Sequence, residues 1–326
     1  MIMDSFKIKA VAKQVPEKVV TNDDLAEILD TSDDWIRRRT GIRRRHVASG
    51  LQNTNLCTAV ANQLLDKAGV AATDLDFIIV ATMSPDYQTP ATAAQVQGRL
   101  GAKRAVAFDI NAACAGFVYG TVTLHRLLQQ TPHGMGLIIG SEQLSKLLDW
   151  HDRSTAVLFG DGASGMLVAN DASESRMLAT DLQTFGEDSQ AITAGQFGVC
   201  SPFSAEKVPA QPAFQMDGHR VYNFAKQQVP ASIRRALIKA NLTTDQIKYF
   251  VLHQANARII DRIAKQLDVP SERFPQNIAE YGNTAAASEP LVLNDLVEQQ
   301  CLKRGDLLVL SGFGGGLTVG TIILRY

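Results

Sequence analysis

Cys114 is the side chain of this sequence best placed for covalent chemistry. It lies within residues 105–120, AVAFDINAACAGFVYG, where a short apolar run typical of a buried strand leads into small residues typical of a helix start. A cysteine on such a turn lies near the positive end of a helix dipole, which favours the thiolate and lowers the pKa of the thiol below its free value of ~8.5. The alternative is a buried structural cysteine, the commoner role for this residue type.

His253 and Asn283 are the candidate partners of this nucleophile. His253 directly follows the apolar segment 248–252, and Asn283 stands between two small residues at an expected helix start. A cysteine with a distant histidine and asparagine is a pattern of nucleophilic catalysis when the fold brings the three together. Each partner also has a commoner role, because an isolated histidine is usually structural and an asparagine in this place often caps a helix.

Other motifs carry weaker signals. Trp35 is followed by the arginine clusters 37–39 and 43–45, which form either a solvated face or a nucleotide site with the ring on a base and guanidiniums on phosphates. The glycine runs 160–162 and 312–316 precede strands and lack the lysine of a phosphate-binding loop, so we interpret them as tight turns lining a pocket, the first of them part of a turn over 160–165.

The composition narrows the class of protein. The 326 residues are 45% hydrophobic, enough for a substantial core, and the net charge of −1 gives no general attraction to nucleic acid. The cysteines lie far apart without CxxC spacing, which argues against a zinc site or disulfide framework; they are Cys57, Cys114, Cys200 and Cys301. Neither a signal-peptide pattern nor an apolar run of the ~20 residues of a membrane span is present. We expect a cytoplasmic protein that binds neither nucleic acid nor membrane.

Strands are expected to alternate with helices, which is typical of a layered α/β fold. The expected strands cover residues 6–13, 77–81, 105–110, 136–140, 156–159, 166–169, 248–252, 307–310 and 318–324. The expected helices cover residues 22–29, a segment around Trp35, 55–69, 91–100, 114–128, 219–240 with a bend or break near Pro230, and a segment entered at 283–288. Residues 170–215 lack a clear pattern, so we interpret them as a connection with covering loops.

The same succession of elements occurs twice along the chain. Val80, at a strand end, precedes Cys114 by 34 residues, and Leu252 precedes Asn283 by 31. We therefore predict a duplicated α/β unit, with the nucleophile in residues 1–172 and the histidine and asparagine in residues 173–326. Ligands of open α/β sheets gather beyond the carboxyl ends of strands, where these side chains would converge.

These residues and their surroundings resemble the β-ketoacyl-ACP synthase III enzymes of the thiolase-like condensing superfamily, essentially end to end. The elongating synthases carry two histidines where this sequence has histidine and asparagine, and thiolases carry a second cysteine. The matching motifs are TSDDWIRRRTGIRRRH (31–46), DINAACAGF (109–117), SEQLSKLLDWHDRSTAVLFGDGASG (141–165), LHQANARI (252–259), YGNTAAASEP (281–290) and GFGGGLTVG (312–320).

The resemblance implies a homodimer with a thiolase-like fold, in which two related βαβαβ-type halves with mixed sheets form α-β-α-β-α layers. It also implies a reaction that initiates fatty acid synthesis without metal or cofactor. Cys114 would take an acyl group from an acyl-CoA, with the N–H groups of Cys114 and Gly315 holding the oxyanion. His253 and Asn283 would stabilise the enolate formed as malonyl-ACP loses CO2, and the enolate would attack the acyl group to give a β-ketoacyl-ACP.

The resemblance assigns further residues. For CoA, Trp35 would stack on the adenine, Arg39 and Arg153 would meet the phosphates, and Gly218 and Asn256 would flank the pantetheine arm. The acyl pocket would be lined by Phe159, Met216 and Phe313. Separately, three basic residues recur at helical spacing after HQAN and suit the acidic acyl carrier protein, although a solvated face is the alternative; they are Arg258, Arg262 and Lys265.

Two positions depart from the family pattern. Thr89 stands where many members place a bulky residue that reaches across the dimer to close the partner's acyl pocket, so longer or branched acyl groups are expected. Glu289 occupies a usually apolar position and has no functional account. Two other interpretations remain at this point: a related condensing enzyme or acyltransferase of secondary metabolism, and an inactive subunit or acyl-CoA-binding module, which the intact cysteine, histidine and asparagine disfavour.

Overall fold

Two mixed β-sheets form the framework of the protein, whose computed structural model describes residues 5–171, 176–199 and 201–326. The first sheet has, in spatial order, β1 (Lys7–Gln14), β7 (Gly162–Ala169), β6 (Met135–Glu142), β4 (Phe77–Ala81) and β5 (Val106–Ile110). The second has β8 (Arg176–Thr184), β13 (Thr318–Arg325), β12 (Leu307–Gly314) and β11 (Tyr249–Leu252). Two small sheets pair β2 (Val19–Thr21) with β3 (Arg44–His46) and β9 (Ile192–Thr193) with β10 (Gln215–Met216).

The two large sheets repeat one topology, as the duplicated sequence pattern predicts. Strands β4 and β6 are parallel neighbours in the first sheet, and β11 and β12 are parallel neighbours in the second. In each sheet an antiparallel strand follows, β7 or β13, and then a second antiparallel strand, β1 or β8. Strand β5 extends the first sheet, and among the described residues it has no counterpart in the second.

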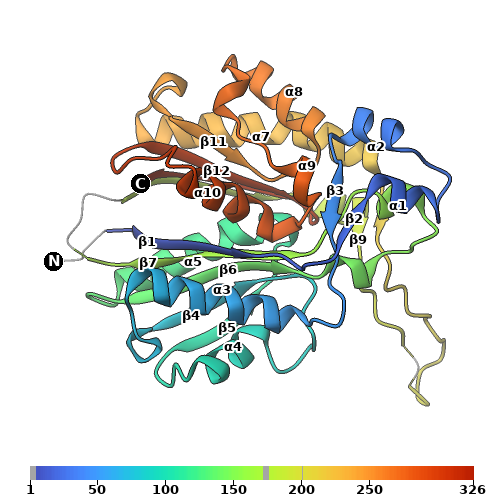
Figure 1. Ribbon diagram of the computed structural model, residues 1–326, viewed down its shortest axis with the longest axis horizontal. Coiled ribbons are helices and arrows are strands. Elements are labelled where there is room, and N and C mark those ends of the chain that lie inside the picture. The colour runs from blue at the N-terminus through green and yellow to red at the C-terminus, as the bar shows by residue number, and fades with distance from the viewer. Residues whose placement is uncertain (1–4, 172–175, 200) are drawn as a thin grey trace.

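The helices form three layers around the two sheets (Figure 1), which confirms the predicted α-β-α-β-α arrangement. Between the sheets lie α5 (Gly116–Gln129) and α10 (Ser288–Glu298), and apolar side chains of both sheets and both helices form one continuous core. The outer face of the first sheet is covered by α3 (Asn53–Ala68) and α4 (Thr92–Leu100). The second sheet is covered by α7 (Gly218–Ala240), on which α8 (Ala257–Leu267) packs.

The secondary structure of two neighbouring segments, residues 156–159 and 160–165, differs from the prediction. The strand predicted at 156–159 is wrong: Arg153–Ala156 is a short helix, α6, because the Asp152 carboxylate accepts a hydrogen bond from the Ser154 N–H and caps it. The glycines of run 160–165 lie mostly within β7 rather than in a turn. A Cβ at Gly165 would collide with the Ile138 carbonyl oxygen of the neighbouring strand, so glycine permits close strand packing here.

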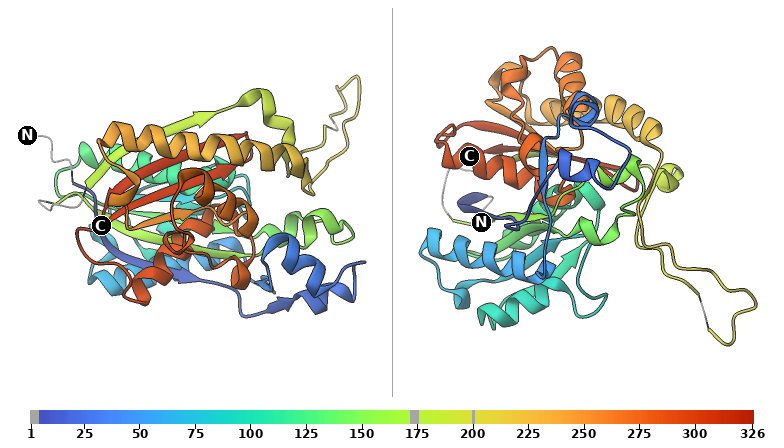
Figure 2. Two further views of the ribbon diagram at one scale, coloured as in Figure 1. Left: turned by 90° about the horizontal axis from the view of Figure 1, so that it is seen from above. Right: turned by 45° about the vertical axis from the view of Figure 1, so that its right-hand side comes forward.

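Residues 170–215 are more regular than predicted. Strand β8 pairs with β13 along its whole length, and its alternating burial is typical of an edge strand with one solvated face. Between β9 and β10 the chain leaves the body as a projecting arm (Figure 2), so it does not serve as a covering loop there. The apolar side chain of Phe203 on this arm is 96% exposed.

The helix predicted at 219–240 runs as one element, α7, through Pro230. The last strand of the first sheet ends at Ala169, and the second sheet begins at Arg176. The predicted domain boundary at 172/173 lies outside the described residues and stays a prediction; Cys200 also lies outside them.

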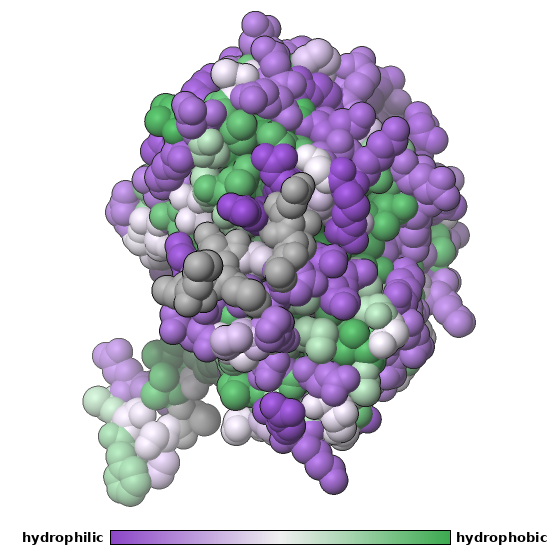
Figure 3. Space-filling view, turned by 90° about the vertical axis from the view of Figure 1, so that its left-hand side faces the viewer, coloured by the Kyte–Doolittle hydropathy of each residue, from purple (hydrophilic) through white to green (hydrophobic). Residues whose placement is uncertain are grey.

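No helix of the described chain is both long and apolar enough to cross a bilayer. Hydrophilic side chains make up most of the face around the termini, and the projecting arm exposes several apolar side chains (Figure 3).

Candidate active site

Cys114 lies on a tight turn between β5 and α5. The turn is the short 3-10 helix Ala113–Ala115, and Ala113 adopts the left-handed region with φ of 45°, a conformation that is strained for a residue with a Cβ. The side chain of Asn111 accepts a hydrogen bond from the Ala113 N–H at 3.0 Å and supports the turn. A Cβ at Gly314 would lie 2.9 Å from the Cys114 sulfur, so only glycine fits beside it.

The second half of the chain builds a matching turn. After the short helix α9 (Ile278–Tyr281), Asn283 leads into the 3-10 helix Ala285–Ala287 and then α10. Ala285 has φ of 42°, close to the value at Ala113. His253 follows β11 directly, and its N–H donates to the Ser311 carbonyl of the adjacent strand at 2.9 Å. The duplication therefore supplies one turn for the nucleophile and one for Asn283, whereas His253 is placed by the end of β11.

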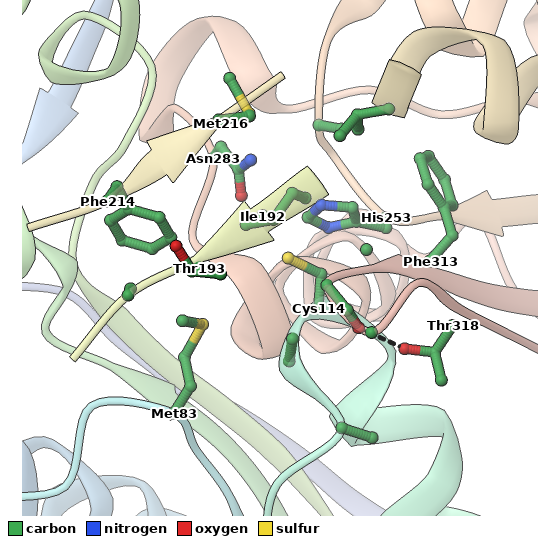
Figure 4. Close-up of a pocket in the computed structure, with 18 of the residues that line it drawn as sticks. Met83, Cys114, Ile192, Thr193, Phe214, Met216, His253, Asn283, Phe313 and Thr318 are labelled. Atoms are coloured by element: carbon green, nitrogen blue, oxygen red, sulfur yellow. Dashed lines mark hydrogen bonds between the residues drawn. The ribbon is translucent and has the colours of Figure 1, made fainter. Parts of the chain in front are cut away.

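The structure brings Cys114, His253 and Asn283 together in one cavity. All three are buried and line a cavity of about 770 Å³. Figure 4 shows the sulfur, the imidazole ring and the amide turned toward one another. The first residue comes from one half of the fold and the other two from the second half, so the cavity exists only where the halves meet.

The ring of His253 is held in a fixed orientation. Its Nδ1 lies 2.7 Å from Ser288 Oγ, and the ring packs edge-on against Phe313 at a centroid distance of 5.2 Å. Because Nδ1 is occupied, Nε2 is the nitrogen left for a ligand in the cavity. Burial lowers the pKa of His253 to about 3, so the imidazole is neutral at neutral pH.

The amide of Asn283 is oriented by its own turn. Its Oδ1 accepts a hydrogen bond from the Ala285 N–H at 2.9 Å, which leaves the NH2 group as a donor for the cavity. Its backbone is tied to the first half, since its N–H donates to the Leu158 carbonyl at 2.9 Å and its carbonyl accepts from the Gly160 N–H at 3.0 Å.

The pKa of the Cys114 thiol is shifted in the direction opposite to the prediction. Burial, with a smaller contribution from the carboxyls of Glu142 and Glu289, raises its pKa above the ordinary value, the opposite of the direction expected for a helix start. The backbone N–H groups of Cys114 and Gly315 point at the sulfur and oppose this shift. The resting residue is therefore a thiol, and two N–H donors converge beside it.

The residues predicted to bind CoA lie in two places. Gly218 and Asn256 line the cavity. Trp35, Arg39 and Arg153 lie outside its wall, where the two guanidiniums stand over the indole ring at 4.6 and 4.9 Å. The Asn256 amide donates to the Arg39 carbonyl at 3.0 Å and connects this cluster to the cavity wall.

Some of the residues predicted for the acyl pocket line the cavity, whereas Thr89 and the residues predicted for docking lie on the surface. Phe159, Met216 and Phe313 line the cavity, whereas Thr89 is exposed and does not line the cavity of its own chain. The basic residues of α8 project from its exposed face, and none forms an ion pair with another described residue; they are Arg258, Arg262 and Lys265.

Comparison with known proteins places the chain in a family. A family model described as 3-oxoacyl-[acyl-carrier-protein (ACP)] synthase III matches residues 108–186, and the model of the C terminal of that synthase matches residues 237–326. The beta-ketoacyl-[acyl-carrier-protein] synthase III of Levilactobacillus brevis is 56% identical over 100% of both chains. The chain belongs to the synthase III family.

Other members support the same assignment. The synthase III of Lactobacillus helveticus is 54% identical over 100% of both chains. The crystal structure of the synthase III from Aquifex aeolicus is 37% identical, with a TM-score of 0.92 over 99% of this chain and 100% of that one. The thiolase-like fold predicted from the sequence is thereby confirmed.

Several residues of this synthase III cavity were not predicted from the sequence. Phe214 stacks on Phe159 at a centroid distance of 4.4 Å, and Met83 and Ile192 complete the apolar wall. Phe214 and Ile192 come from the segment without clear periodicity, so no local pattern identified them. Ser288, which contacts His253, was part of a quoted motif but had no assigned role.

Proposed function

We propose that this synthase III condenses an acyl-CoA with malonyl-ACP, releasing CoA and CO2 and forming the β-ketoacyl-ACP that initiates fatty acid synthesis. The observation that carries the proposal is the convergence of Cys114, His253 and Asn283 in one buried cavity, with two backbone N–H groups at the sulfur. This set provides a nucleophile, an oxyanion site and two neutral hydrogen-bond donors.

In the first half-reaction Cys114 attacks the thioester carbonyl of the acyl-CoA. The carbonyl oxygen becomes an oxyanion, which the N–H groups of Cys114 and Gly315 stabilise. The carbon–sulfur bond to CoA breaks, and the thiol proton leaves with the CoA sulfur. The acyl group stays on Cys114, so the kinetics are ping-pong.

In the second half-reaction malonyl-ACP occupies the cavity and loses CO2. The electrons of the broken bond form an enolate on the thioester oxygen, where His253 Nε2–H and the Asn283 amide donate hydrogen bonds. The enolate carbon attacks the acyl group and expels the Cys114 thiolate, which then takes up a proton. Two neutral donors provide the electrostatic stabilisation, so the proposal includes no metal or cofactor.

The surroundings of the cavity support the partners in this proposal. The cluster of Trp35, Arg39 and Arg153 offers an aromatic face and two cations for the nucleotide of CoA. The exposed basic face of α8, whose Ile259 reaches the cavity, suits an acidic carrier protein. Cysteine usage supports a cytoplasmic location.

The first sheet supports the proposed homodimer. Strand β5 lies at its edge, and Val106 at the start of the strand is 57% exposed. An exposed sheet edge is a template for pairing with a second copy. The small, exposed Thr89 would then leave room in the partner's cavity for acyl groups longer or more branched than acetyl.

Mass spectrometry tests the reaction directly. The protein is incubated with straight acyl-CoAs from acetyl to octanoyl and with branched ones, and then with malonyl-ACP or malonyl-CoA. We expect an acyl adduct on Cys114 that malonyl-ACP discharges more efficiently than malonyl-CoA; Cys114→Ala should form none. No adduct with any donor would contradict the proposal, and discharge by malonyl-CoA alone would indicate a different acceptor.

A further inference from the structure

Glu289 is a fully buried carboxyl group beside Ser288, whose hydroxyl lies at hydrogen-bond distance from His253. It occupies the second position of α10 and has 0% exposure. Its Oε2 lies 2.9 Å from Ser288 Oγ, and its Oε1 has no hydrogen-bond partner among the described residues. A Cβ at Gly312 would lie 2.5 Å from Oε1, so the carboxyl packs directly against the backbone of β12.

Burial outweighs the two hydrogen bonds, from the Ser288 hydroxyl and from the backbone N–H of Glu289, that favour a negative charge on the Glu289 carboxyl. It forms no ion pair with any described residue, and burial raises its pKa well above the ordinary value. The titratable groups on the elements packed around it are the neutral His253, the Cys114 thiol and Glu142, whose own pKa burial raises to about 8. Burial without an ion pair therefore favours the neutral acid form of this carboxyl.

The hydroxyl of Ser288 has three neighbours and a single proton to share. The Gln254 N–H donates to it at 3.3 Å, His253 Nδ1 lies at 2.7 Å and Glu289 Oε2 at 2.9 Å. An ionised Glu289 only accepts, so it would take the Ser288 proton and force a proton onto Nδ1, leaving Nε2 bare. A neutral Glu289 can donate instead, which frees Ser288 to donate to Nδ1 and places the ring proton on Nε2.

We propose that Glu289 is a positioning residue: as a carboxylic acid it donates to Ser288, Ser288 donates to Nδ1 of His253, and this chain fixes the histidine proton on Nε2, facing the cavity. The inference rests on the proposed function, because the enolate needs a donor at that nitrogen. It gives a role to an acidic side chain at a position where the resemblance expects an apolar one.

Spectroscopy of the intact protein at pH 7 tests the chain without relying on activity. In protein with 15N-labelled histidine, assigned by comparison with His253→Gln, we expect His253 to be protonated on Nε2 and not on Nδ1. In the infrared spectrum, Glu289→Gln should remove a neutral carboxylic acid band that persists in Glu142→Gln. A proton on Nδ1 of His253, or the absence of an acid band from Glu289, would overturn the proposal.

Kinetics then test whether Glu289 acts through Ser288. We expect Glu289→Leu to slow discharge of the acyl-enzyme by malonyl-ACP by about tenfold, and Glu289→Gln, which retains a donor, to slow it less. In a Ser288→Ala background neither substitution should add more than about a twofold loss. Equal losses in both backgrounds would show a packing role and contradict the inference.

Failure of the inference is distinguishable from failure of the proposed function. Acyl loading of Cys114 is measured by mass spectrometry on every variant. If no variant and no wild-type protein loads, the proposed function is wrong, yet the histidine and infrared signals still decide the state of Glu289. If loading is normal and those signals are absent, the positioning role alone is wrong.

Discussion

At the scale of single residues, the two donors of the cavity are held by different means. Asn283 is oriented by a backbone N–H of its own turn, whereas His253 depends on a side chain from α10. In the proposed function both act on the thioester oxygen of the malonyl group, and neither is needed to hold the acyl group on the sulfur. The two half-reactions should therefore respond separately to substitutions at Cys114 and at its partners.

Asn283→Ala should separate loading from condensation. Removal of one donor to a developing oxyanion costs on the order of 100-fold in rate, so we expect condensation to slow by about that factor while Cys114 still takes the acyl group. Mass spectrometry follows loading, and release of CO2 from malonyl-ACP follows the second step. Loss of loading with normal decarboxylation would contradict the role given to Asn283.

Gly314→Ala should displace the side chain of Cys114 and so slow its acylation. The new Cβ would lie 2.8 Å from the Cys114 Cβ and 2.9 Å from its sulfur, so the strand or the turn must move. We expect acyl loading to fall at least about tenfold, with a loss of about 1–3 kcal/mol in the free energy of unfolding. Gly98→Ala, in open space on α4, is the matched control and should lower neither quantity. Normal loading by Gly314→Ala would show that the turn has room.

At the scale of elements, local patterns identified the strands and helices that carry the site. The apolar runs before Cys114 and His253 predicted β5 and β11, and the small residues around Asn283 predicted the entry to α10. The meeting of Cys114, His253 and Asn283 in one cavity was predictable because all three residues follow such signals; their catalytic roles stay a prediction. The strand predicted at 156–159 was wrong, because Asp152 caps a short helix, Arg153–Ala156, that reaches into the apolar run.

What the sequence could not provide is the environment created by packing. The pKa of the Cys114 thiol follows burial between two sheets, which a local helix-dipole argument does not include. The stacking of Phe214 on Phe159 joins segments from different halves, and the former lies in a region without periodicity. Glu289 is connected to His253 because the Ser288 hydroxyl lies at hydrogen-bond distance from both side chains, and the spacing of these residues in the sequence does not show this contact.

Charge reversal on α8 should weaken carrier-protein binding alone. We expect Arg258→Glu with Arg262→Glu to raise the KM for malonyl-ACP by about tenfold and to spare acyl-CoA loading, because exposed charges mainly steer association. Added salt should raise the wild-type KM toward that of the variant. Lys9→Glu with Lys303→Glu, at exposed positions outside α8, provides a control with the same change in net charge. Equal damage to both half-reactions would contradict a docking role.

At the scale of the whole molecule, the packing of two sheets on shared helices buries titratable groups that the unfolded chain exposes. His253 has a pKa lowered to about 3 from 6.5, so its contribution to stability is full above pH 6.5 and is lost as the pH falls toward 3. Glu142 and Glu289 have raised pKa values, so their contribution to stability is lost as the pH rises. The stability of the fold therefore falls with decreasing pH because of His253 and with increasing pH because of Glu142 and Glu289.

Glu289→Gln should weaken the loss of stability that accompanies rising pH. Above about pH 4.5 the unfolded carboxyl releases a proton that the folded state keeps, so stability from this group is full below pH 4.5 and falls as the pH rises toward the folded pKa, by up to about 1.4 kcal/mol per pH unit. Urea unfolding from pH 5 to 8 should give a shallower decline for the variant than for wild type, and Glu272→Gln, at an exposed position, should follow wild type. Equal slopes in all three proteins would mean that Glu289 keeps its charge when folded, which would also remove the basis for its donation to Ser288.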